Sequence, residues 1–174
     1  TSRISELRLV LEYQSARRGR NRTLTLDIVD YPGEWLLDLP LLELDYDAWA
    51  RTALAQSRAP ARKKAAKDWH KAVSEVDPGA PADEALAEKL SDLFKSYLRE
   101  ARSDQYALST LPPGRFLMPG DLEGSPALTF APLDADGEAE FPRSSLWTMM
   151  ARRYEAYKAH VVRPFFRDHF ARLD

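Results

Sequence analysis

Two stretches near the start of the chain alternate regularly between apolar and polar residues. In the first, SELRLVLEYQ at 5–14, the apolar side chains are Leu7, Leu9, Leu11 and Tyr13. In the second, over 23–29, they are Leu24, Leu26 and Ile28. A period of two is typical of a strand with one buried face, and a short basic loop with one glycine separates the two stretches. The pattern therefore predicts an antiparallel hairpin of half-buried strands.

Helical spacing dominates the chain after residue 30. A leucine-rich stretch at 36–42, interrupted by Pro40, favours a short helix or a turn. Further helices are predicted over about 46–57, 62–76, 83–107 and 144–172. Asp83 is the expected N-cap of the third of these, and Pro164 should kink the fourth.

A region rich in proline and glycine, residues 109–143, separates the last two predicted helices. Glycine and proline favour turns, so most of this region is predicted to be loop. A short strand is expected at ALTF, residues 127–130.

Composition narrows the class of protein. The chain has 174 residues, of which 44% are hydrophobic and 30% charged, and this excludes a disordered protein. The formal net charge of −2 gives no strong overall attraction to nucleic acid or to an anionic membrane. The absence of cysteine excludes disulfides, thiolate metal sites and cysteine nucleophiles, and it suits a reducing compartment.

The printed sequence contains neither an obvious membrane span nor a secretion signal. No apolar run approaches the ~20 residues that a spanning helix needs, and no charged-then-apolar segment opens the chain. A cytoplasmic location is therefore expected. Thr1 is an unusual first residue, and the chain stops just after a helical pattern, so we interpret it as an internal fragment.

The residues that follow the second predicted strand carry candidate chemistry. Asp30 comes directly after the apolar run, and Gly33 and Glu34 follow it closely. In nucleoside triphosphatases an Asp-x-x-Gly segment after a strand holds Mg²⁺ through the carboxylate and offers a backbone N–H to the terminal phosphate. The residue after the glycine is placed to orient the attacking water. The alternative is an ordinary polar turn, because Asp, Pro and Gly are all favoured in turns.

The stretch LTLDIVDYPGEWLLDLPLL at 24–42 resembles the signature of the YcjX-like family, bacterial P-loop proteins related to GTPases. The resemblance extends to TSRISELRL at 1–9, to PGRFLMPGDLEGSPALTFAPL at 113–133 and to FFRDHFARLD at 165–174. It therefore touches most of the chain.

The resemblance implies an α+β fragment of an α/β P-loop triphosphatase. Residues 1–45 would hold the switch-region hairpin and the Asp-x-x-Gly loop, and residues 46–174 a large helical insertion. The implied activity is the binding and hydrolysis of GTP, or of ATP, with Mg²⁺. A protein partner is expected to bind the helical insertion and to sense the nucleotide state there.

The resemblance also assigns roles to individual residues. Asp30 and Gly33 fall on the family's Asp-x-x-Gly motif, so Asp30 would serve Mg²⁺ and Gly33 the nucleotide. Thr1 lies where GTPase-like proteins carry a switch threonine that reaches Mg²⁺, and Ser2 or Ser5 is an alternative to it. Glu34 occupies the position at which many small GTPases carry a catalytic glutamine, and a carboxylate there could act as a base.

Two motifs of such proteins are absent from the printed sequence. It contains no G-x-x-x-x-G-K-[ST], the loop that cradles phosphates, and no Asn-Lys-x-Asp motif for reading guanine. Both are expected outside the fragment, the first before Thr1 and the second after Asp174. The chain alone is therefore expected to hold no nucleotide tightly.

A helical interaction module without chemistry of its own is the alternative. Its binding surfaces would be the proline- and glycine-rich loop and a basic cluster near two aromatic rings; the cluster comprises Arg62, Lys63, Lys64, Lys67 and Lys71. A nucleic-acid face is one interpretation of this cluster, but the near-neutral chain favours a solvated helix, so no nucleic-acid partner is expected. Contact with a membrane surface stays open. The histidines at 70, 160 and 169 are too widely spaced for a transition-metal site.

Overall fold

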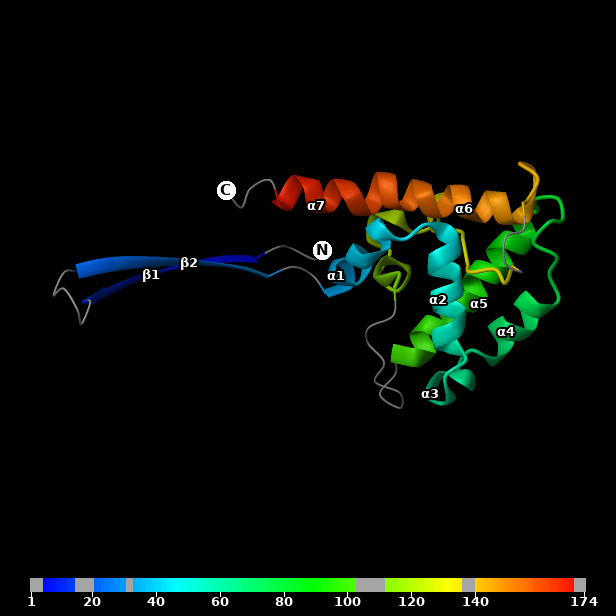
Figure 1. Ribbon diagram of the computed structural model, residues 1–174, viewed down its shortest axis with the longest axis horizontal. Helices are drawn as coiled ribbons and strands as arrows, with labels where there is room; N and C mark the ends of the chain where they lie inside the picture. The colour runs from blue at the N-terminus through cyan, green and yellow to red at the C-terminus, as the bar shows by residue number, and fades with distance from the viewer. Residues whose placement is uncertain (1–4, 15–20, 31–32, 103–111, 136–139, 171–174) are drawn as a thin grey trace.

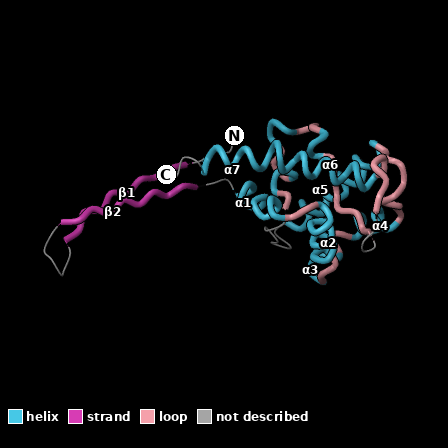
Figure 2. Tube along the Cα trace, turned by 45° about the horizontal axis from the view of Figure 1, so that its top comes forward, coloured by secondary structure: helices cyan, strands magenta, loops and turns pink. Residues whose placement is uncertain are grey.

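The first two elements form a hairpin that projects from a helical body (Figures 1 and 2). The computed structural model describes residues 5–14, 21–30, 33–102, 112–135 and 140–170. Strands β1 (Ser5–Gln14) and β2 (Asn21–Asp30) pair antiparallel, with Leu7 opposite Ile28 and Leu9 opposite Leu26. The predicted antiparallel hairpin is confirmed.

The prediction of half-buried strands is wrong for the described residues. The apolar side chains that face one another across the hairpin are 37–54% exposed. No element of the described chain packs on this face, and the hairpin points away from the helices in Figure 1. Alternation specifies a face suited to burial, but it does not specify that the same stretch of chain supplies the covering layer.

The helical body follows the hairpin. Its elements are α1 (Gly33–Asp38), a 3₁₀ turn (Leu39–Glu43), α2 (Tyr46–Ser57), α3 (Pro60–Lys63), α4 (Lys67–Ser74), α5 (Glu84–Arg102), 3₁₀ turns at Gly114–Phe116, Gly120–Leu122 and Pro126–Leu128, α6 (Leu146–Tyr157), a π-helical turn (Lys158–Val162) and α7 (Arg163–Phe170). None of the helices within the described ranges is long and apolar enough to cross a membrane.

Aromatic side chains form the centre of this body. Trp49 of α2 is 1% exposed and stacks on Tyr154 of α6, with ring centroids 4.9 Å apart. Edge contacts join Trp49 to Phe94 of α5 at 5.9 Å and to Phe130 of the loop at 5.5 Å. Each aromatic ring buries a large apolar area, so this cluster holds the helices and the loop together.

Side-chain caps begin the helices where the sequence has acidic or hydroxyl residues. Asp45 Oδ1 accepts from the Ala48 N–H of α2 at 2.8 Å, and Asp83 Oδ1 accepts from the Leu86 N–H of α5 at 3.0 Å. The predicted cap at Asp83 and the predicted range of α2 are confirmed. A capping oxygen satisfies a backbone donor that the helix itself leaves free.

Replacing Asp45 with alanine should lower the free energy of unfolding by about 1 kcal/mol, because the Ala48 N–H would lose its acceptor. Chemical denaturation of the 174-residue chain measures the change. Asp45→Ser is the matched control, since serine keeps a capping oxygen and should lose much less. Equal losses for both variants would show that the cap is not what stabilises α2.

Two predicted elements differ in the structure. The predicted helix over 62–76 is divided into α3 and α4, with a turn between them. The predicted strand at 127–130 is wrong, because Pro126–Leu128 is a 3₁₀ turn. Ser125 Oγ accepts from the Ala127 N–H at 3.2 Å and starts this turn, with Pro126 in its first position. Local capping outweighs the short apolar run.

The last helix is also not a single kinked α-helix. A π-helical turn separates α6 from α7, and the Arg163 N–H donates to the Lys158 carbonyl five residues earlier. Proline lacks an N–H, and its ring clashes with the carbonyl four residues before it in an α-helix. The wider turn just before Pro164 provides an alternative to a kink, and α6 and α7 run nearly in line in Figure 1.

Candidate functional site

Asp30 is the last residue of β2, opposite Ser5 of β1, and its side chain is exposed. Successive side chains of a strand alternate between its faces, so Asp30 lies on the same side of the hairpin as Leu26 and Ile28. Thr1 and Ser2 lie outside the described residues. The structure thus places the predicted carboxylate at a strand end, on the side of the uncovered apolar face.

Gly33 and Glu34 are the first two residues of α1. The candidate motif therefore runs from the end of a strand directly to the start of a helix, with only residues 31–32 between. No group of three or more His, Asp or Glu side chains in the described ranges is arranged to hold a metal ion. Within these ranges Asp30 has no neighbouring ligand set.

Asp38, the last residue of α1, was not predicted from the sequence to matter. It is fully buried, and its carboxylate accepts hydrogen bonds from the Gly114 N–H at 2.7 Å, from the Arg115 N–H at 3.4 Å and from the Tyr157 hydroxyl. The last contact is between two side chains 119 residues apart. Asp38 thus joins α1 to both the proline- and glycine-rich loop and α6.

Burial raises the pKa of Asp38 to about 6, and the hydrogen bonds from Tyr157, Gly114 and Arg115 act in the opposite direction. Burial also raises the pKa of Tyr157 well above its usual value, and the negative charge of Asp38 raises it further. Tyr157 therefore stays protonated and remains the hydrogen-bond donor of this pair.

Trp35 forms a second contact between α1 and the rest of the body. Its ring stacks on Phe165 of α7, with centroids 3.8 Å apart and an interplanar angle of 2°. The Arg115 guanidinium lies over the Trp35 ring at 4.7 Å from its centroid. Arg115 also donates from its guanidinium to the Pro119 carbonyl at 2.7 Å. A cation over an aromatic face is attracted by the ring quadrupole, so Trp35 is held on two sides.

A serine of α2 and a histidine of α4 also meet, but the serine is buried. Ser57 Oγ donates to the Leu54 carbonyl at 2.8 Å and lies 2.7 Å from His70 Nε2. The donor of the Ser57–His70 hydrogen bond depends on the tautomer of the imidazole. Because Ser57 is fully buried, this pair connects α2 to α4 and leaves no hydroxyl for a substrate.

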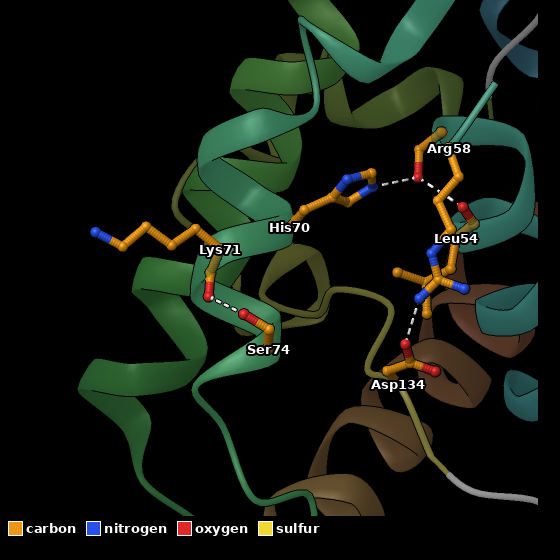
Figure 3. Close-up of polar contacts among 7 residues, drawn as sticks. Leu54, Arg58, His70, Lys71, Ser74 and Asp134 are labelled. Atoms are coloured by element: carbon orange, nitrogen blue, oxygen red, sulfur yellow. Dashed lines mark hydrogen bonds and ion pairs between the residues drawn. The ribbon is translucent and has the colours of Figure 1, made fainter. Parts of the chain in front are cut away.

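An ion pair lies beside this serine and histidine. Arg58 pairs with Asp134, and both line a pocket of 320 Å³ together with His70 and Lys71 (Figure 3). Burial lowers the pKa of His70, and the positive charge of Arg58 lowers it further. The carboxylate of Asp134 neutralises the cation that an anionic ligand would need.

The lysines of the basic cluster face solvent, whereas the neighbouring ring of Trp69 is buried in the core. Lys63, Lys64, Lys67 and Lys71 are exposed. Trp69 is 1% exposed and stacks on Tyr97 of α5 at 5.3 Å. The ring that suggested a nucleic-acid face thus belongs to the core, which favours the interpretation as a solvated helix.

A family model and two curated relatives each match the whole of this chain. A model of the YcjX-like family, DUF463, matches residues 1–174. A protein of Escherichia coli (strain K12) named Ras-like GTPase YcjX is 37% identical over 185 residues, which cover 100% of this chain and 39% of that relative. A protein of the same name from Shewanella oneidensis is 35% identical, with 100% of this chain and 38% of the relative covered. The chain spans about two fifths of the length of these curated relatives.

Proposed function

The chain belongs to the YcjX-like family, and from this membership we propose that it is the switch-bearing part of a P-loop triphosphatase that binds and hydrolyses GTP with Mg²⁺. Both curated relatives carry the name Ras-like GTPase. The observation that carries the proposal for this chain is the position of Asp30 and Gly33, at the end of β2 and the start of α1. A carboxylate at a strand end, followed by a glycine amide, suits a metal-bound phosphate.

Asp30 fits the magnesium side of such a site. Its carboxylate is exposed, and none of the ion pairs within the described ranges involves it. Mg²⁺ prefers carboxylate and water oxygens and keeps several of its waters. One carboxylate is sufficient only if phosphate oxygens, water and further residues complete the coordination shell of Mg²⁺. Thr1 is the candidate for a further ligand from this chain, with Ser2 or Ser5 as the alternative.

Gly33 and Glu34 would act on the terminal phosphate. The Gly33 N–H is proposed to donate to a phosphate oxygen, where the absence of a side chain lets the backbone approach. Glu34 is proposed to orient the attacking water or to accept its proton. Bound Mg²⁺ would supply charge neutralisation on the phosphates, and the protein groups position the reactants.

The uncovered apolar face of the hairpin supports a division of the intact protein. Residues 1–45 are proposed to belong to the nucleotide-binding sheet and residues 46–174 to form a helical insertion. Leu26 and Ile28, at 46% and 44% exposed, would be covered by the part of the protein that this chain does not include. Burying them would contribute on the order of 1 kcal/mol each, because they are already half covered.

A non-catalytic helical interaction module is the second candidate. The dense aromatic core of α2, α5 and α6 favours it, because such a body needs no nucleotide to hold its shape. The sequence of the intact protein before Thr1 discriminates between the two. A strand followed by a loop ending in Gly-Lys-Ser or Gly-Lys-Thr supports the triphosphatase, and its absence supports the module.

Titration calorimetry with GTP and Mg²⁺ tests the proposed function. The intact protein should bind GTP, whereas the 174-residue chain should give no measurable heat, because its sequence has no phosphate-cradling loop. Absence of binding by the intact protein would overturn the triphosphatase assignment. Micromolar binding by the 174-residue chain would instead show that the phosphate site lies within it.

A further inference from the structure

Helix α1 lies between the proposed phosphate site and the helical body. It has six residues, from Gly33 to Asp38, and these two residues are roughly 7.5 Å apart along the axis at the rise of an α-helix. Figure 1 shows α1 where the chain passes from the hairpin to the helices. Such a short helix turns as one rigid piece, so whatever fixes Trp35 and Asp38 also restricts Gly33.

Asp38 and Trp35, through their contacts with the helical body, are the two anchors of α1. Burying the carboxylate of Asp38 costs free energy of folding. A fully buried carboxylate that has no ion pair among the described residues loses much of its hydration. A well-packed apolar side chain would commonly stabilise a core as well or better. What the carboxylate adds is direction, because its acceptor oxygens meet donors from Gly114 and Tyr157.

The anchor at Trp35 shares a residue with the anchor at Asp38. Arg115 donates its backbone N–H to Asp38 and places its guanidinium over Trp35. Its Nε is buried and has no hydrogen-bond partner in the described structure. Arg115 therefore keeps an unsatisfied polar atom while it holds α1, and Phe165 closes the opposite side of the Trp35 ring.

We propose that Trp35 and Asp38 are positioning residues, which fix α1 on the helical body so that the Gly33 amide is held ready for the terminal phosphate of GTP. This inference rests on the proposed function. A helix held in place before binding does not have to be ordered at the moment of binding, and this preorganisation strengthens the contact. GDP lacks the terminal phosphate, so its affinity should not depend on these anchors.

Tyr157→Phe in the intact protein tests the inference. The change removes only the hydroxyl that donates to Asp38 and keeps the ring that packs on Phe116 and Phe130. The dissociation constant for a non-hydrolysable GTP analogue should rise about 5-fold or more, while that for GDP stays unchanged. Trp35→Leu, which removes the stacking on Phe165, should give the same selective loss.

Tyr46→Phe is the matched control. It also removes a buried hydroxyl, but one that donates to the carbonyl of Ala131, outside α1, at 2.7 Å. Both nucleotides should bind this variant as they bind the wild type. Unchanged binding by Tyr157→Phe, or an equal loss for GDP and the GTP analogue, would overturn the inference. Failure of the wild-type protein to bind the GTP analogue would overturn the proposed function, and the inference with it.

Discussion

Asp30→Ala in the intact protein should reduce Mg²⁺-dependent GTP hydrolysis by about 10- to 100-fold, the loss typical when an outer-shell carboxylate of a metal site is removed. Activity should fall because a carboxylate that holds Mg²⁺ through water positions the metal ion on the phosphates. Steady-state phosphate release at several Mg²⁺ concentrations measures the effect. Part of the lost rate should return at high Mg²⁺, because the defect lies in metal affinity.

Asp27→Ala is the control for this prediction. Asp27 is also an exposed aspartate of β2, three residues before Asp30 and on the other face of the hairpin. Unlike Asp30, it forms an ion pair with Arg8, at 2.6 Å. Removing an exposed ion pair changes stability by at most about 1 kcal/mol. Hydrolysis should therefore be close to that of the wild type. Equal losses for the two variants, or full activity of Asp30→Ala, would remove Asp30 from the site.

Asp38→Asn should remove a pH dependence of stability that we expect in the wild-type chain between about pH 4 and pH 7. The pKa of Asp38 is about 6 in the folded chain, against a usual value of 3.8. Between these values the folded state binds more protons than the unfolded state. The stability contributed by the protonated acid is therefore complete below about pH 4 and is lost as the pH rises through 6.

The size of this effect follows from the pKa difference and is about 3 kcal/mol. Asparagine keeps an acceptor for the Gly114 N–H and has no charge to bury. Denaturation of the two chains across this pH range should therefore show the wild type losing about 3 kcal/mol relative to the variant. Parallel stability curves would mean that Asp38 is not the group whose titration matters.

Regular patterns of sequence predicted the elements whose cause is local. The hairpin was predicted from alternation over 5–14 and 23–29, and α2 from its helical pattern. Asp30 and Gly33 were found because their spacing in the sequence is itself the signal. Their positions at the end of β2 and the start of α1 agree with that interpretation, and their chemical roles remain predictions.

The anchors of α1 could not be predicted in this way. Nothing in the sequence around Asp38 indicates that its partners are Gly114 and Tyr157, which lie 76 and 119 residues away. The same applies to Trp35 and Phe165, which meet only when the last helix lies beside the first. The one signal in the sequence is that this aspartate lies in a leucine-rich stretch, because a carboxylate buried among apolar residues needs hydrogen-bond donors.

The π-helical turn at Lys158–Val162 also sets the rotational phase of α7. In an uninterrupted α-helix each residue turns by about 100°, so Phe165, eight residues after Tyr157, would face about 80° away from it. The wider turn absorbs one residue, and Phe165 then follows Tyr157 by an effective two full turns. Tyr157 and Phe165 therefore reach α1 from one side, Tyr157 at Asp38 and Phe165 at Trp35. Deleting one residue here would shorten the helix but preserve this alignment, whereas straightening the turn without a deletion would rotate Phe165 off Trp35.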